Sequence, residues 1–73
     1  MNETVKIWLI DMIDAEIKEV TSNISNQKLW MHGVTDVETV AMFVSNINDL
    51  EEYKEILFTL RKQIYGGKIN ARN

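Results

Sequence analysis

The residues with the most chemistry in this chain stand together between positions 28 and 36. Trp30 and His32 offer flat faces on which a base could stack, and Thr35 offers a hydroxyl. Asp36 stands where a new helix is expected to begin, and the free N–H groups of a helix N-terminus attract anions. The same residues also fit a structural interpretation, in which Trp30 fills a hairpin corner and His32 precedes a glycine turn. One histidine and no cysteine argue against a metal site.

A second group of candidate residues lies near the C-terminal end of the chain. Arg61 and Lys62 supply positive charge for a phosphate, and Tyr65 follows Arg61 by four residues, on the same helix face. The plainer interpretation is that these cations complement the C-terminal end of a helix dipole. In an antiparallel hairpin this group lies beside the start of the first helix, far from Trp30. A site that combines both groups therefore requires a second copy of the chain.

Catalysis has little support in the sequence. Two pairs of carboxylates share a helix face: Asp11 with Asp14, and Glu51 with Glu55. Such pairs serve acid–base chemistry or cation binding, but lysines interleave with both at helical spacing, and solvated ion pairs explain that pattern better. The sequence has no phosphate loop, dinucleotide turn or serine–histidine–acid set. We therefore expect no enzymatic activity, no cofactor and no bound metal.

The elements that position these residues are helices separated by glycine. Proline is absent, and glycine occurs only at positions 33, 66 and 67, so these positions mark the ends of elements. The first helix is expected to begin between residues 2 and 4 and to end at about Met31. Its apolar seam repeats at intervals of three and four residues: Ile10, Ile13, Ile17, Val20 and Ile24. This spacing is typical of a helix that packs against other helices.

A second apolar stripe runs along another side of the same helix, in its N-terminal half: Val5, Trp8, Met12 and Ala15. A helix that is apolar on two sides is usually buried on both. A chain of 73 residues without disulfides has too small a core to cover both sides by itself. We therefore expect the chain to pair with copies of itself, as a dimer or tetramer.

The next segment is expected to form a short helix. Thr35 and Glu38 match a capping box, which places its start at about Asp36. Its expected inner face consists of Val37, Val40, Ala41, Val44 and Ile47, with Met42 and Phe43 pointing elsewhere. The serine and asparagines between positions 45 and 48 compete for backbone hydrogen bonds, so they predict a break in the helix there.

A medium helix is then expected from about Asp49 to Tyr65, with Gly66 as its cap. Its seam again alternates intervals of three and four residues: Leu50, Tyr53, Leu57, Leu60 and Ile64. The predicted fold class is therefore all-α. One long helix folds back, antiparallel, on a short and a medium helix, and the hairpins assemble as an oligomeric bundle.

Charge divides the chain into two regions. Residues 1–60 carry all eleven acids and four bases, whereas residues 61–73 carry four bases and no acid. We expect one helical domain over residues 1–65 and a short basic tail over residues 66–73. No apolar run is long enough for a signal peptide or a membrane span, so the expected location is the cytosol of a bacterium or of an infected cell.

Scattered positions between residues 28 and 57 resemble small helical proteins carried by phages of Gram-positive bacteria: Trp30, Thr35, Asp36, Met42, Asn46, Ile47, Leu50 and Tyr53. They are also similar to phage anti-CBASS proteins, which are helical oligomers that sequester cyclic nucleotide signals. The resemblance implies a binding role for Trp30, Thr35 and Asp36 only. In those sponges this stretch leads into the final helix, whereas here another full helix is expected to follow.

Three functions follow as expectations. The first is a non-enzymatic protein that sequesters a cyclic dinucleotide at subunit interfaces and so blocks host immune signalling. Its ligand-binding residues would stack on a base, donate hydrogen bonds or neutralise phosphate: Trp30, His32, Thr35, Asp36, Arg61, Lys62 and Tyr65. The second is an inhibitor or regulator that binds a host protein through its acidic face. The third is a nucleic-acid-binding dimer that uses the basic C-terminal end.

Overall fold

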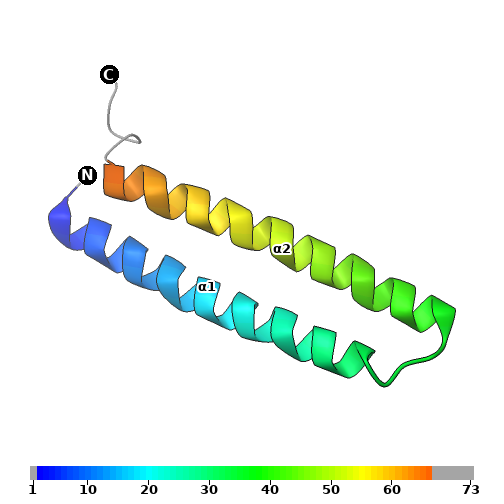
Figure 1. Cartoon of the computed structure of the whole chain (residues 1–73). Coiled ribbons are helices and arrows are strands. Elements are labelled where there is room, and N and C mark those ends of the chain that lie inside the picture. The colour runs from blue at the N-terminus through cyan, green and yellow to red at the C-terminus, as the bar shows by residue number, and fades with distance from the viewer. Residues whose placement is uncertain (1, 67–73) are drawn as a thin grey trace.

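The computed structural model describes residues 2–66, which form two antiparallel α-helices joined by a short turn (Figure 1). Helix α1 spans Glu3–Met31 and helix α2 spans Val37–Gly66. The rod that they form measures 52 × 21 × 11 Å along its principal axes. The expected all-helical hairpin is confirmed, and the described part of the chain contains no strand. Apart from Gly66, the expected basic tail lies outside the described residues.

Helix α1 begins and ends where the sequence predicts. Asn2 has an extended backbone, and its side-chain oxygen accepts a hydrogen bond of 2.7 Å from the backbone N–H of Thr4. This contact satisfies one of the N–H groups that a helix start leaves free. At the other end, the N–H groups of His32, Gly33 and Val34 donate to carbonyl groups three residues earlier and so close the last turn.

The cap of helix α2 differs from the prediction by one residue. Asp36, not Thr35, precedes the helix, and its Oδ2 accepts hydrogen bonds from the backbone N–H and the hydroxyl of Thr39, at 2.9 and 2.7 Å. Glu38 is exposed and makes no part of this cap. A carboxylate is a better acceptor than a hydroxyl for N–H groups at the positive end of a helix, which explains why Asp36 takes the position.

The predicted break between residues 45 and 48 is wrong, because helix α2 runs through it without interruption. Ser45, Asn46 and Asn48 are exposed, so their polar groups reach solvent and do not compete for the helix backbone. Ile47 between them is only 7% exposed and lies in the core. Burial of this one side chain against α1 outweighs the modest helix propensities of its neighbours. The short and medium helices are therefore one helix.

The seam that α1 contributes to the core is the predicted one. Ile10, Val20 and Ile24 are buried, and Ile13 and Ile17 are partly buried. The central cluster joins Val20 and Ile24 to residues of α2: Ile47 and Leu57. The partly buried residues around this cluster are Ile13, Ile17, Met31 and Leu50.

The seam of α2 differs from the prediction at several positions. Leu57 and Ile64 are buried as expected, but Tyr53 and Leu60 are 41% and 39% exposed. Lys54 and Arg61 are partly buried in their place. The observed seam keeps intervals of three and four residues along the whole helix: Val40, Phe43, Ile47, Leu50, Lys54, Leu57, Arg61 and Ile64. A strict repeat of this kind keeps one face of a helix against its partner.

The first turns of α2 also present a different face from the one expected. Val37, Ala41 and Val44 are exposed, whereas Phe43, which was expected to point elsewhere, is partly buried. The same strict repeat explains both differences, because Phe43 lies four residues before Ile47 and therefore on its face. Met42 is exposed, as expected.

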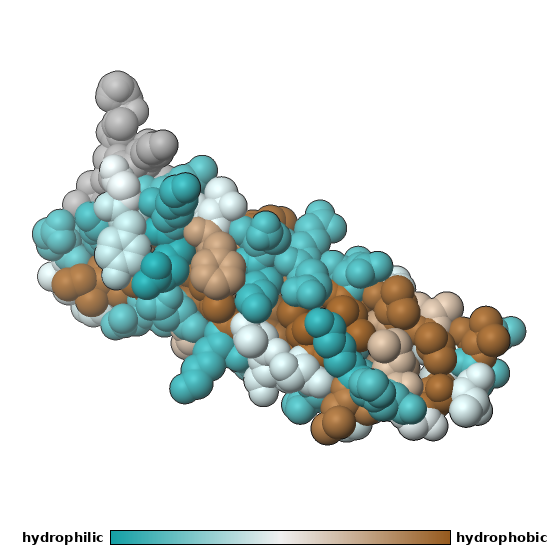
Figure 2. Space-filling model, in the orientation of Figure 1, coloured by the Kyte–Doolittle hydropathy of each residue, from teal (hydrophilic) through white to brown (hydrophobic). Residues whose placement is uncertain are grey.

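The second stripe of α1 is exposed on the single chain, including Val5, Trp8 and Met12. Figure 2 shows one face of the rod, on which apolar atoms follow the line between the helices and gather again beside the turn. Among residues 2–66, fourteen large apolar side chains are exposed, six are buried and the rest are partly buried, so the hairpin leaves about half of them uncovered. Neither α1 nor α2 has a stretch long and apolar enough to cross a bilayer.

Candidate functional site

The structure places the candidate residues at the two ends of the rod. Trp30, His32, Thr35 and Asp36 surround the turn, whereas Arg61, Lys62 and Tyr65 lie in the last two turns of α2, at the opposite end. The rod is 52 Å long, so no small ligand can touch both groups on one chain. This separation is the one expected from an antiparallel hairpin.

Four exposed apolar side chains cluster in sequence around the turn, and we call them the turn patch: Leu29, Trp30, Val37 and Met42. Trp30 does not fill the corner of the hairpin, because its side chain is 59% exposed. His32 beside it is also exposed. The turn end of the molecule therefore presents an indole and three aliphatic side chains to solvent.

The N-terminus of α2 is already occupied by a negative charge. The hydrogen bonds from the side chain and the backbone of Thr39 lower the pKa of Asp36 below its ordinary value, so the carboxylate stays ionised. Its charge sits where an external anion would bind the helix end. Thr35 is exposed one residue before this cap. Asp36 thus has a structural role that accounts for its presence without a ligand.

Arg61 is held by two partners at the other end of the rod. Its Nε donates to Oδ1 of Asp14 on α1, and its guanidinium carbon lies 4.7 Å from the ring centroid of Tyr65. The hydrogen bond to Asp14 raises the pKa of Arg61 above its ordinary value. Lys62 is exposed. The pairing of Arg61 with Asp14 could not be found from local spacing, because the two residues are 47 positions apart.

One side of the rod carries an apolar surface that combines Met12, from the second stripe of α1, with residues of α2 that were expected in the core. A shallow depression there is lined by residues of both helices: Leu9, Met12, Ile13, Glu16, Tyr53 and Leu57. The hydroxyl of Tyr53 donates to Oε2 of Glu16 at 2.7 Å, and this bond raises the pKa of Tyr53 above its ordinary value.

Helical spacing extends this surface along α2. Ile56 and Leu60 follow Tyr53 by three and seven residues, on the same side of the helix, and both are exposed. We call these residues the side strip: Leu9, Met12, Tyr53, Ile56 and Leu60. The repeat at positions 53, 56 and 60 is the signal that could have revealed it.

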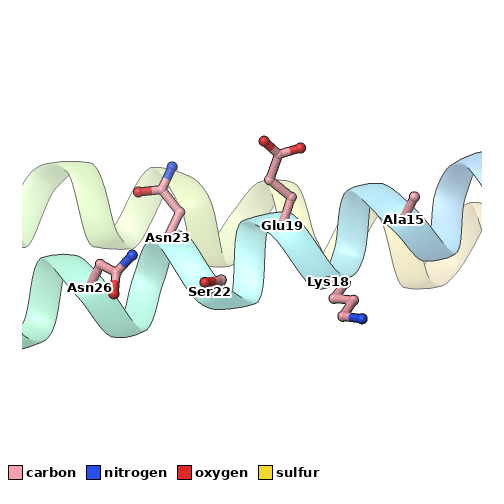
Figure 3. A pocket seen from close by; sticks show the side chains of 6 residues that line it. All are labelled: Ala15, Lys18, Glu19, Ser22, Asn23 and Asn26. Atoms are coloured by element: carbon pink, nitrogen blue, oxygen red, sulfur yellow. The ribbon is translucent and has the colours of Figure 1, made fainter.

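A hollow on the outer face of α1 has none of the features of a ligand site. Its lining comes from one helix only, as Figure 3 shows: Ala15, Lys18, Glu19, Ser22, Asn23 and Asn26. No second element closes over it, and ligand sites are usually concave and largely enclosed. Within residues 2–66, no three histidine or acidic side chains come together to hold a metal ion.

Comparison with models of known families, with curated proteins and with solved structures gives no match. The features of the molecule that bear on its function are therefore the two apolar surfaces and the charges around them.

Proposed function

We propose that this chain is a non-enzymatic recognition protein that binds a protein partner through the turn patch. The observation that carries this proposal is the exposure of Leu29, Trp30, Val37 and Met42 around a single turn. Tryptophan is among the residues that most often dominate the free energy of protein association. Three of the four residues belong to the two helices and Val37 begins the second, so the backbone beneath the patch is already ordered before binding.

The charges of the rod support the same class of function. Residues 1–60 have a net charge of −7, from eleven acids and four bases. Such a surface steers a basic partner toward the molecule over distances of about 8 Å at physiological salt. The acidic face that the sequence favours as a binding surface then acts mainly on the rate of encounter, while the turn patch supplies the contact.

The experiment is capture of partners from a bacterial lysate with the tagged full chain and with two matched variants. Trp30→Ala removes the indole of the turn patch, and Trp8→Ala removes a tryptophan of similar exposure, 62%, from the other end of α1. We expect a stoichiometric protein partner with the wild type and with Trp8→Ala, and its loss with Trp30→Ala. Equal capture by all three chains, or no stoichiometric partner at all, contradicts the proposal.

Sequestration of a cyclic dinucleotide is the second candidate, and the exposed indole of Trp30 beside His32 supports it. Arg61 and Lys62 lie at the other end of the rod, so a second copy has to supply the phosphate contacts. Binding raises the melting temperature by mass action. A panel of cyclic dinucleotides at millimolar concentration that leaves the melting temperature unchanged removes this candidate.

A further inference from the structure

We propose that the side strip is the surface through which two copies of this chain pair. In this pairing the copies lie antiparallel over the halves that contain residues 2 and 66, and the two turn patches point in opposite directions. The pairing stands on the side strip alone and does not depend on what the turn patch binds.

The hairpin is weakly packed in the half that carries the side strip. Beyond the central cluster, toward residues 2 and 66, only Ile10 and Ile64 are buried among the described residues. Lys6, Lys54 and Arg61 occupy positions on the seam itself and are partly buried there. Charged heads at a seam contribute less apolar burial than leucine or isoleucine would. This half of the rod is therefore the part of the fold that additional apolar cover would stabilise most.

A second copy of the chain is the cover that is present wherever the chain is made. The exposed parts of the side strip amount to on the order of 500 Å² per copy, the size of the largest apolar patch on a typical monomer, which is often a functional surface. Two such patches and their rims approach the lower limit of stable protein interfaces, roughly 1,200 Å² in total. The area is thus close to that of the smallest stable dimers.

The side strip carries little charge, which permits contact between two copies. Glu16 is the one ionisable acid that lines the depression, and its carboxylate already accepts the hydrogen bond from Tyr53. Two copies therefore meet mainly through apolar side chains, and each Glu16 carboxylate enters the interface with a hydrogen-bond donor already in place.

The same side also determines the direction of pairing. Two acids lie on the same side of the rod as the strip, but nearer the turn. Glu19 follows Glu16 by three residues on α1, and Asp49 precedes Tyr53 by four residues on α2. Figure 3 shows Glu19 and Asn23 pointing away from α1 in the same direction. A parallel arrangement would set Glu19 and Asp49 against their own copies, which repel. An antiparallel arrangement centred on the strip sets these acids opposite the first turns of α1 and the last turns of α2 in the other copy, away from their own copies.

The first test is sedimentation equilibrium of the full chain at micromolar concentration. We expect a dimer for the wild type and a dissociation constant raised about 30-fold or more by Ile56→Glu. Leu29→Glu makes the same change at an exposed aliphatic residue of the turn patch and should leave the dimer intact. Circular dichroism on the same samples checks that Ile56→Glu stays helical, and Met12→Lys provides a second disruption on the other helix. The proposal is overturned if the wild type is a helical monomer, or if neither Ile56→Glu nor Met12→Lys changes the dissociation constant of the dimer.

The second test measures the direction. The chain has no cysteine, so Ser45→Cys gives a single exposed site for a spin label near the turn. At a rise of 1.5 Å per residue, antiparallel pairing over the strip puts the two labels about 45 Å apart, and parallel pairing brings them within about 25 Å. A distance between the labels within about 25 Å contradicts the antiparallel arrangement. Partner capture by the monomeric Ile56→Glu variant tests the proposed function separately, so failure of one leaves the other standing.

Discussion

The hydroxyl of Tyr53 on α2 donates a hydrogen bond of 2.7 Å to the carboxylate of Glu16 on α1, and this contact links the two helices beside the side strip. The bond needs the protonated phenol. For that reason the pKa of Tyr53 is raised in the folded chain.

The contribution of this contact to stability has a definite pH dependence. A pKa raised by folding means that the stabilisation is complete below the pKa of the unfolded phenol, near 10, and is lost as pH rises through the folded value. We expect the urea midpoint of the wild type to fall more steeply above pH 10 than that of Tyr53→Phe. Tyr65→Phe changes the other tyrosine and serves as the control. Identical curves for wild type and Tyr53→Phe contradict the contact.

The cap of α2 provides a second pH-dependent contribution, of opposite sign. Because the pKa of Asp36 is lowered by folding, its stabilisation is complete above the unfolded pKa and is lost as pH falls through the lower folded value. We expect Asp36→Ala to lower the urea midpoint at neutral pH. Below about pH 4, the urea midpoint of this variant should decrease less with falling pH than that of the wild type. Thr35→Ala, which alters the residue that the sequence favoured as the cap, should change little. The reverse order of effects would show that Thr35 caps the helix.

The continuity of α2 is tested at Asn48. In an uninterrupted helix an exposed asparagine is less favourable than alanine, so Asn48→Ala should stabilise the fold by about 0.5 kcal/mol. If a new helix began after Asn48, the same change would remove its cap and destabilise by about 1 kcal/mol. The sign of the shift in the urea midpoint therefore decides between the two structures. Ser45→Ala, also exposed within α2, should shift in the same direction as Asn48→Ala.

Two leucines of α2, three residues apart, test which face of this helix packs against α1. Leu57 is buried in the central cluster, and Leu57→Ala should destabilise the fold by about 2–4 kcal/mol at any protein concentration. Leu60 lies on the side strip, so the effect of Leu60→Ala should depend on pairing. Denaturation at concentrations where the dimer has dissociated should show a much smaller loss for Leu60→Ala than for Leu57→Ala. Equal losses at every concentration would place both leucines in the seam.

Helix α1 could be predicted well because its sequence offers one complete seam. Isoleucine or valine stands at each of its central positions, from Ile10 to Ile24, and no competing stripe runs along the same length. Asn2 and Gly33 mark the ends by local chemistry that does not depend on the rest of the fold. Local pattern and tertiary packing agree here, so the structure follows the pattern.

Helix α2 could be predicted only in part because its sequence offers two overlapping seams. One contains Tyr53 and Leu60, and the other contains Lys54 and Arg61. Apolarity favours the first, but the fold uses the second, in which Tyr53 reaches Glu16 and Arg61 reaches Asp14. Those acids lie 37 and 47 positions away, so no local window contains the deciding information. The apparent break has the same origin, because the burial of Ile47 is a property of the hairpin.

The candidate residues could be located from the sequence more easily than their roles. The prediction that the group at Trp30 and the group at Arg61 lie at opposite ends followed from the antiparallel hairpin alone. The capping role of Asp36 and the ion pair of Arg61 depend on atoms that spacing does not position. The side strip could not be predicted as one surface, because Met12 belongs to the second stripe of α1 whereas Tyr53 and Leu60 fit the predicted core.

Residues 2 and 66 emerge beside one another, and the turn stands at the far extremity of a 52 Å rod (Figure 1). An anchor fused at either terminus would thus hold the molecule by its base and leave the indole of Trp30 projecting into the surroundings. Such a tethered molecule would act as a stiff arm of fixed reach, able to probe a neighbouring surface several nanometres from its point of attachment.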